Sequence, residues 1–167
     1  MKRKVVALLV VVLSVLVVAP ARAQEIAPLV DVVGYMRNNN GRCLDVETVG
    51  GRLGTRMLHS ACHFGDTQRF RFRKDSVLNR WTIRPETANN TCVDVFNNAG
   101  PDLVRHPCHG GNNQAWALDG DFWVSYLNNH VLDASGTDRR ALNWPYNGGA
   151  NQRWTILPQN SPLVFQI

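Results

Sequence analysis

Short apolar or alternating runs, separated by clusters of turn-forming residues, make up most of the chain after about residue 30. None of the runs continues with the 3.6-residue period of an amphipathic helix. Glycine, asparagine, aspartate and proline gather between the runs, and these residues favour turns. The pattern therefore predicts an all-β fold of many short strands, either a barrel or a sandwich. The runs lie at residues 32–36, 70–72, 81–83, 92–95, 116–118, 122–127 and 154–157.

A short motif occurs three times along the chain. A glutamine, any residue and then an aromatic residue stand at 68–70, 114–116 and 152–154. At nearly constant spacing before each copy comes Leu or Val followed by an aspartate, which is Asp45, Asp94 or Asp133. Two landmarks that keep their spacing three times indicate one triplicated supersecondary unit. We expect repeats at approximately 32–75, 76–119 and 120–160, arranged as a closed barrel with a pseudo-threefold axis.

The cysteines follow the same repeat, because two fall in the first copy and two in the second. This symmetry predicts two intra-repeat disulfides, Cys43–Cys62 and Cys92–Cys108. A metal site is the competing interpretation, since His63 and His109 directly follow Cys62 and Cys108. Adjacent Cys and His are poorly spaced for two ligands of one ion, so we expect neither a metal nor a cofactor.

The first 23 residues have the features of a secretory signal peptide. Basic residues at 2–4 precede an apolar stretch at 5–18, and residues 21–23 read Ala-Arg-Ala, a small-x-small cleavage pattern. The apolar stretch is short for a membrane span. We expect a mature domain over residues 24–167 that is secreted or periplasmic and has no membrane span after cleavage.

Removal of the predicted signal peptide would change the net charge of the chain. Four of the 18 Lys and Arg residues lie in the predicted signal peptide, as against none of the 13 Asp and Glu residues. The mature domain is therefore almost neutral, and its charge indicates no polyanionic partner. A basic cluster at residues 69–74 alternates with Phe70 and Phe72, which is typical of a strand with one solvated face. We expect no nucleic-acid partner.

The three Asp motifs, the three Gln-x-Trp or Gln-x-Phe motifs and the cysteine placement together resemble the ricin B-type lectins. This resemblance covers residues 32–157 and implies a β-trefoil with three pseudo-equivalent four-strand repeats and one potential sugar pocket in each. It also implies roles for the residues. The aspartate accepts hydrogen bonds from sugar hydroxyls, an aromatic platform two residues before the second cysteine position stacks on the sugar, and an Asn-Gln pair positions the carboxylate.

Compared with that pattern, the three pockets differ. The third is complete, with Asp133, Trp144, Asn151 and Gln152. The second is altered because a histidine replaces the aromatic platform, and its residues are Asp94, His106, Asn113 and Gln114. The first keeps Asp45 and Gln68 but has Ser60 and Thr67 at the other two positions, so we expect a degenerate, structural site.

The resemblance implies a secreted lectin that binds glycans, most commonly of the galactose type. An adhesion subunit of a toxin, or a protein-binding trefoil similar to protease inhibitors, is the alternative, and its partner chain is unknown. We do not expect an enzyme. The aspartates are spread over three repeats, and the histidines lie beside no recognisable serine or cysteine nucleophile motif.

Overall fold

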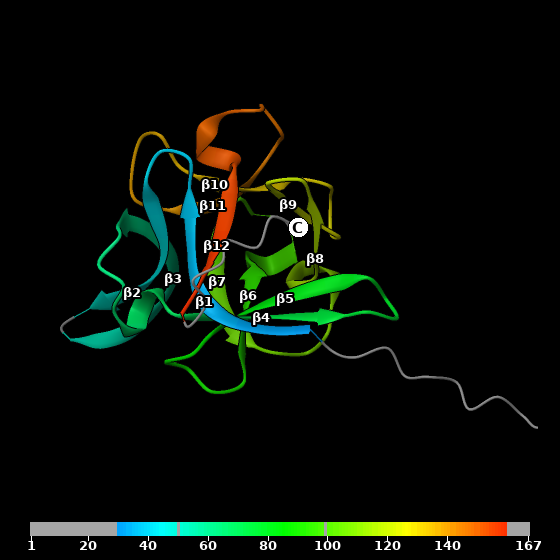
Figure 1. Cartoon of the computed structure of the whole chain (residues 1–167), viewed down its shortest axis with the longest axis horizontal. Coiled ribbons are helices and arrows are strands. Elements are labelled where there is room, and N and C mark those ends of the chain that lie inside the picture. Colours follow the sequence, from blue (N-terminus) through cyan, green and yellow to red (C-terminus); the bar gives the residue numbers. More distant parts are fainter. Residues whose placement is uncertain (1–29, 50, 99, 160–167) are drawn as a thin grey trace, which may run out of the picture.

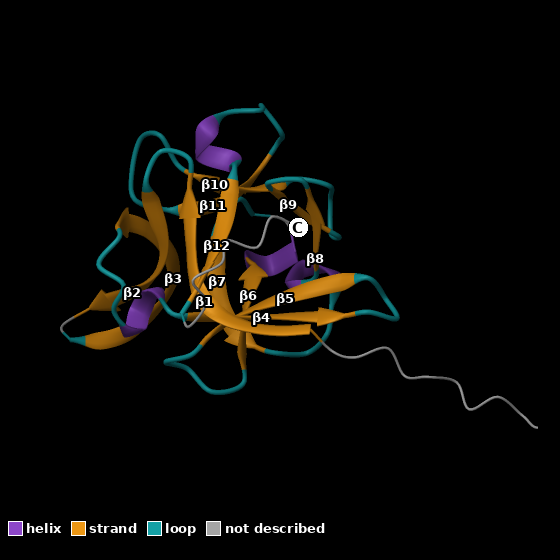
Figure 2. Ribbon diagram, in the orientation of Figure 1, coloured by secondary structure: helices purple, strands orange, loops and turns teal. Residues whose placement is uncertain are grey.

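The computed structural model describes residues 30–49, 51–98 and 100–159. The predicted signal peptide at 1–23 lies outside this range, as do both ends of the proposed 24–167 domain. The described chain is all-β with short 3-10 turns (Figures 1 and 2). Its strands are β1 (Val30–Asn38), β2 (Arg42–Val49), β3 (Arg52–Ala61), β4 (Phe70–Asp75), β5 (Arg80–Pro85), β6 (Thr91–Val95), β7 (Leu103–Pro107), β8 (Trp116–Asp119), β9 (Phe122–Ser125), β10 (Val131–Ala134), β11 (Ala141–Trp144) and β12 (Trp154–Pro158). Within the described ranges, no helix has the length and apolar character needed to cross a membrane.

Antiparallel pairing joins the strands into a twelve-stranded sheet, in which β1 pairs with both β4 and β12. Three hairpins extend from this barrel, formed by β2–β3, β6–β7 and β10–β11. Single bridges connect the three hairpins to one another, at Arg56↔Val104, Leu58↔Arg140 and Asp102↔Leu142. The predicted trefoil of three repeats is therefore confirmed.

The aromatic residues of the repeated motif form the centre of the barrel. Phe70, Trp116 and Trp154 are between 0 % and 2 % exposed and belong to one apolar core. Trp154 also donates its indole N–H to the carbonyl of Leu132, which satisfies this buried donor. Phe72 is buried beside Phe70, while Arg71 on the opposite face pairs with acidic side chains. These tryptophans act in packing and are not available to a ligand.

Each repeat has a 3-10 turn that ends on its motif glutamine. These turns are η1 (Asp66–Gln68), η3 (Asn112–Gln114) and η4 (Ala150–Gln152), and a glycine precedes each of them. In all three turns the glutamine N–H donates to that glycine's carbonyl, at 3.0 to 3.1 Å. The repeat in sequence is thus a repeat in backbone geometry, and it brings each glutamine side chain back over its own hairpin.

Both predicted disulfides are present, as Cys43–Cys62 and Cys92–Cys108. They join β2 to the end of β3 and β6 to the end of β7, with sequence separations of 19 and 16. In the third repeat Val131 and Tyr146 stand at the equivalent positions. Val131 is buried, and Tyr146 packs edge-on against Phe122 at a ring-centre distance of 4.9 Å.

We expect each disulfide to stabilise the fold by about 3 kcal/mol, because each closes a short loop that the unfolded chain would otherwise leave free. Replacing Cys92 and Cys108 together by serine should therefore lower the free energy of unfolding by about this amount. Urea denaturation under oxidising conditions measures the change. Unchanged stability of the Cys92→Ser/Cys108→Ser variant would contradict the expectation, and reduction of the wild type with a thiol provides the comparison.

Candidate functional site

The same strand register builds the candidate site in each repeat. The aspartates lie on β2, β6 and β10, and each pairs with the residue two positions before the platform position on the neighbouring strand. Side chains at such diagonal positions share one face of the hairpin and lie within reach of each other. The register therefore brings together the pairs Asp45 and Ser60, Asp94 and His106, and Asp133 and Trp144.

The motif glutamine connects the aspartate to the turn. Its side-chain nitrogen donates to the aspartate Oδ2 at 3.1 Å in the first repeat and 2.7 Å in the other two. The same nitrogen donates to a backbone carbonyl at the end of the hairpin, and the amide oxygen accepts a backbone N–H from the turn. The glutamines are Gln68, Gln114 and Gln152, and all are at most 1 % exposed. They both hold the turn and position the carboxylate.

The third repeat leaves part of its carboxylate available. Asn151 and Gln152 both donate to Oδ2 of Asp133, at 2.9 and 2.7 Å. Within the described part of the chain, no residue donates a hydrogen bond to Oδ1 of Asp133. Trp144 is 46 % exposed, whereas Asp133 is 4 % exposed. An exposed indole beside a fixed carboxylate oxygen can bind a ligand that has an apolar face and hydroxyl groups.

The second repeat uses both oxygens of its carboxylate internally. Asn113 donates to Oδ1 of Asp94 at 2.8 Å, while Gln114 donates to Oδ2 at 2.7 Å. His109 adds a third contact, since its Nε2 lies 3.3 Å from Oδ2. The Nδ1 of His109 accepts the Gly111 N–H, so the ring proton lies on Nε2 and is donated to the aspartate. This contact of His109 is not predicted by the sequence motifs.

Potential metal ligands also meet in the second repeat. Ligand atoms of Asp94, His106 and His109 all lie within 4.8 Å of one another. However, a metal at Nε2 of His109 would require the ring proton to move to Nδ1, where it would face the Gly111 N–H. Histidines that bind metals usually donate their other nitrogen to an acceptor. The hydrogen bonding here favours an imidazole that supports the carboxylate, and the expectation of no metal stays a prediction.

The first repeat directs three side-chain donors at one oxygen of its carboxylate. Oδ2 of Asp45 accepts from Ser60 at 2.5 Å, from Gln68 at 3.1 Å and from Nε2 of His63 at 3.2 Å. Burial by itself raises the pKa of Asp45, but the hydrogen bonds from Ser60, Thr67, Gln68 and His63 outweigh it and hold the pKa below its ordinary value. The aspartate is thus an ionised internal anchor.

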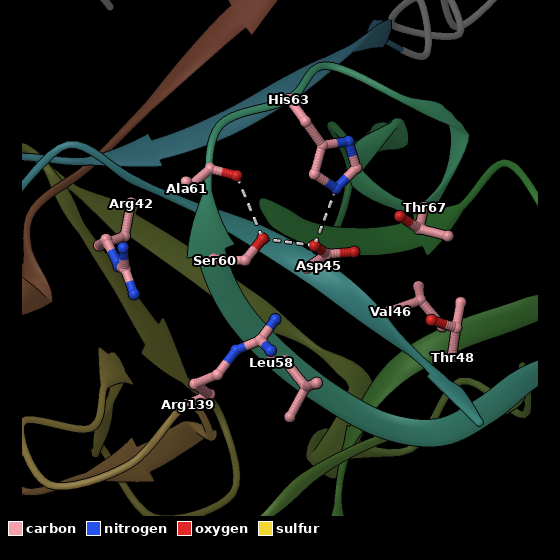
Figure 3. A pocket seen from close by; sticks show the side chains of 10 residues that line it. All are labelled: Arg42, Asp45, Val46, Thr48, Leu58, Ser60, Ala61, His63, Thr67 and Arg139. Atoms are coloured by element: carbon pink, nitrogen blue, oxygen red, sulfur yellow. Dashed lines mark hydrogen bonds and ion pairs between the residues drawn. The ribbon is translucent and has the colours of Figure 1, made fainter. Parts of the chain in front are cut away.

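A wide hollow of about 590 Å³ nevertheless opens at this first repeat (Figure 3). Its lining combines the residues around Asp45 with Arg42 on β2 and with Arg139, which comes from the third repeat. The space exists because Ser60 occupies the platform position, where Trp144 has a large ring. The position expected to be only structural therefore has room for a ligand.

Two further hollows, of about 520 and 350 Å³, lie on other parts of the surface. The first is bordered by Phe122, Tyr146 and Arg153, and the second by a group of arginines on β4 and β5. Trp144 lines none of these three hollows. The third-repeat site is consequently an exposed ring beside a carboxylate, in contrast to the deeper first-repeat hollow.

Replacing Ser60 by alanine should raise the pKa of Asp45, because the largest stabilising hydrogen bond to the carboxylate is lost while burial remains. A lowered pKa in the folded state stabilises the protein above the unfolded value of about 3.9, and this stability is lost as the pH falls through the folded pKa. Ser60→Ala should therefore cost about 1–2 kcal/mol at pH 7 and much less at pH 3. Carboxyl-detected NMR titration measures the pKa, and an unshifted Asp45 resonance would contradict the expectation.

Comparison with known families gives one match over most of the described chain. The profile of the family described as ricin-type beta-trefoil lectin domain matches residues 32–154. A search of curated protein sequences gives no match.

Three of the solved structures with the same fold are a designed protein and two lectins. A designed threefold-symmetric protein, ThreeFoil, has a TM-score of 0.61 and 24 % identity, with 73 % of this chain and 95 % of that chain covered. The β-trefoil lectin of the Vibrio vulnificus haemolysin, solved with N-acetyl-D-lactosamine bound, has a TM-score of 0.62 and 23 % identity, with 80 % of this chain and 98 % of that chain covered. The agglutinin of Abrus precatorius has a TM-score of 0.62 and 21 % identity, with 75 % of this chain but only 46 % of that one covered.

Proposed function

The chain belongs to the ricin-type β-trefoil lectin family, and on this premise we propose that it is a secreted lectin that binds galactose-type sugars through its third repeat. The family supports carbohydrate binding in general. Export is supported by the signal-like first 23 residues and by the two disulfides, which persist in oxidising compartments.

One observation carries the choice of the third repeat. Asp133 has an Oδ1 to which no described residue donates, and of the three aspartates it alone shares its face of the hairpin with an exposed indole, that of Trp144. A pyranose offers hydroxyl groups on its edges and a patch of C–H bonds on one face. The free oxygen would accept the hydroxyl hydrogen bonds while the indole covers the C–H patch.

The second repeat is proposed as a weaker site. His106 is exposed at the platform position, but its ring is smaller and more polar than an indole, and it lies edge-on to His109 at 5.8 Å. Both oxygens of Asp94 are already hydrogen-bonded internally. A sugar would therefore have to compete with these donors. Two sites of unequal strength on one chain would still raise the avidity for a dense glycan surface.

Binding without catalysis is part of this proposal. A glycosidase would need two carboxylates on either side of one scissile bond. Here Asp45, Asp94 and Asp133 lie at equivalent positions on separate hairpins, and each is hydrogen-bonded to its own glutamine.

A glycan array probed with the purified, oxidised chain tests the proposal. We expect signals for glycans that end in galactose or N-acetylgalactosamine, and N-acetyl-D-lactosamine is the first compound to titrate because it is bound in the Vibrio vulnificus trefoil. Binding restricted to other neutral sugars would overturn the galactose preference. No binding to any glycan would overturn the lectin proposal and favour a protein-binding trefoil.

A further inference from the structure

The first-repeat hollow combines a missing platform with two guanidinium groups that have no ion-pair partner among the described residues. We propose that this hollow binds an acidic sugar, whose carboxylate or sulfate group is held between Arg42 and Arg139. This site goes beyond the neutral-sugar function proposed for the third repeat and uses none of its residues.

The charge that a ligand meets in this hollow is positive. Asp45 is only 6 % exposed and three side chains donate to its Oδ2, so little of its one negative charge faces a ligand, as against the two positive charges of Arg42 and Arg139. Arg42 is half-buried and Arg139 is exposed, and both line the opening. Figure 3 shows both arginines on one side of Asp45, with His63 and Thr67 on the other.

Neither arginine is used elsewhere in the described part of the chain. No ion pair or side-chain hydrogen bond joins Arg42 or Arg139 to another residue described by the structure, whereas the adjacent Arg140 bonds Asp138 at 2.7 Å and Asp102 at 2.8 Å. Arg71 is likewise paired with Asp31 and Glu86. The two arginines at the hollow therefore have donors left for a ligand.

The position of Arg139 is fixed by a contact between repeats. The buried side chain of His59 on β3 places its Nε2 3.0 Å from the carbonyl oxygens of both Ser135 and Asp138. Its backbone N–H donates to the carbonyl of Arg139 itself at 2.7 Å. The loop at 135–140 is thus attached to the wall of the hollow. Its arginine is presented to the ligand before binding, which reduces the entropy cost of association.

The chemistry of the lining selects the ligand class. A guanidinium binds a carboxylate or sulfate through two parallel hydrogen bonds, and two of them can replace the binding energy that a stacking ring supplies elsewhere. Ser60, His63 and Thr67 offer polar groups for hydroxyls on the remainder of the molecule. A volume of about 590 Å³ is sufficient for a monosaccharide with an acidic substituent.

Isothermal titration with matched sugar pairs tests the proposal. The probes are galacturonic acid and galactose 6-sulfate against galactose, with inorganic sulfate and phosphate as free anions. We expect an acidic sugar to bind at least about tenfold more tightly to the wild type than to the Arg42→Gln/Arg139→Gln variant. The affinity should fall at high salt, because part of it is electrostatic. Whether carboxylate or sulfate is preferred follows from the first two probes.

Arg73→Gln/Arg80→Gln is the matched control, since it also removes two positive charges, but from a different hollow, and should bind acidic sugars like the wild type. Equal losses of affinity in this control and in Arg42→Gln/Arg139→Gln would overturn the proposal. Equal affinity for galactose and for both acidic sugars would overturn it too, and equal affinity for inorganic anions would overturn its sugar component.

Binding measurements on two variants distinguish this site from the third-repeat site. Trp144→Ala should leave acidic-sugar binding unchanged, while Arg42→Gln/Arg139→Gln should keep its binding of N-acetyl-D-lactosamine. The proposal for the first-repeat hollow and the proposal for the third repeat can then fail independently of each other. Thermal unfolding of both variants checks that they are folded.

Discussion

Replacing Trp144 by alanine should abolish most binding of neutral sugars while leaving the fold intact. The indole is 46 % exposed, so its loss creates no internal cavity. The sugar, in contrast, loses the flat apolar surface opposite its C–H patch. We expect the affinity for the best neutral glycan of the array to fall at least about tenfold, which corresponds to about 1.4 kcal/mol. Isothermal titration measures the affinity, and thermal unfolding should change little.

Two control variants separate stacking from a general loss of exposed aromatic surface. Trp144→Tyr keeps a ring at the platform and should retain a large part of the affinity. Tyr126→Ala removes a ring that is 40 % exposed and contacts the β4–β5 turn through the carbonyl of Asn79, and it should bind like the wild type. Undiminished binding by Trp144→Ala would show that the third repeat is not the neutral-sugar site.

Replacing Gln152 by glutamate should strongly destabilise the protein at neutral pH, although the two side chains have the same shape. The Gln152 amide nitrogen lies 2.7 Å from Oδ2 of Asp133 and 2.9 Å from the carbonyl of Pro145. A glutamate would put a carboxylate oxygen there, facing two acceptors with no donor between them. We expect a cost of about 3–5 kcal/mol at pH 7, because a buried charge is left without a partner.

Acid should reduce this cost. Two carboxylates that share a buried site raise the pKa of one of them, so the Gln152→Glu variant takes up a proton at a pH above the usual 4.3 of glutamate. An acid whose folded pKa is raised destabilises the fold at high pH; this penalty begins to decrease as the pH falls through the folded pKa and is absent below the unfolded pKa. Urea denaturation of wild type and variant at pH 7 and pH 4.5 should thus show a smaller difference at the lower pH.

Gln159→Glu is the matched control, because it adds the same charge at an exposed position and should cost little at either pH. A difference in the free energy of unfolding between Gln152→Glu and wild type that does not depend on pH would contradict the electrostatic explanation. It would leave lost packing as the cause.

The fold could be predicted from the sequence because its determinants are local and repeated. Three copies of one motif define three turns of the same shape, and the symmetry of Cys43, Cys62, Cys92 and Cys108 specifies both disulfides. The core position of Trp116 and Trp154 follows from the same alignment. Short strands such as β7 and β11 have weak patterns by themselves, and their positions follow from the motifs around them.

The site was predictable only as far as it lies within one repeat. The resemblance to the family implies that Asp133 and Trp144 share one pocket, whereas the contacts of His63 and His109 with their aspartates depend on how the turn folds back. The repeated Cys-His pair marks these two histidines in the sequence, but adjacency alone does not indicate that the turn brings each ring to its aspartate. Arg139 enters the first-repeat hollow from another repeat, and no local pattern indicates this.

The attachment of the 135–140 loop to His59 limits how this protein can be engineered. Trefoils invite the exchange of whole repeats as modules, on the assumption that each module carries its own site. Here a chimera that receives a second copy of the first repeat in place of the third would lose the Trp144 surface and also the Arg139 side of the hollow. The first and third repeats must therefore be transplanted together, as one unit joined by the contacts of His59.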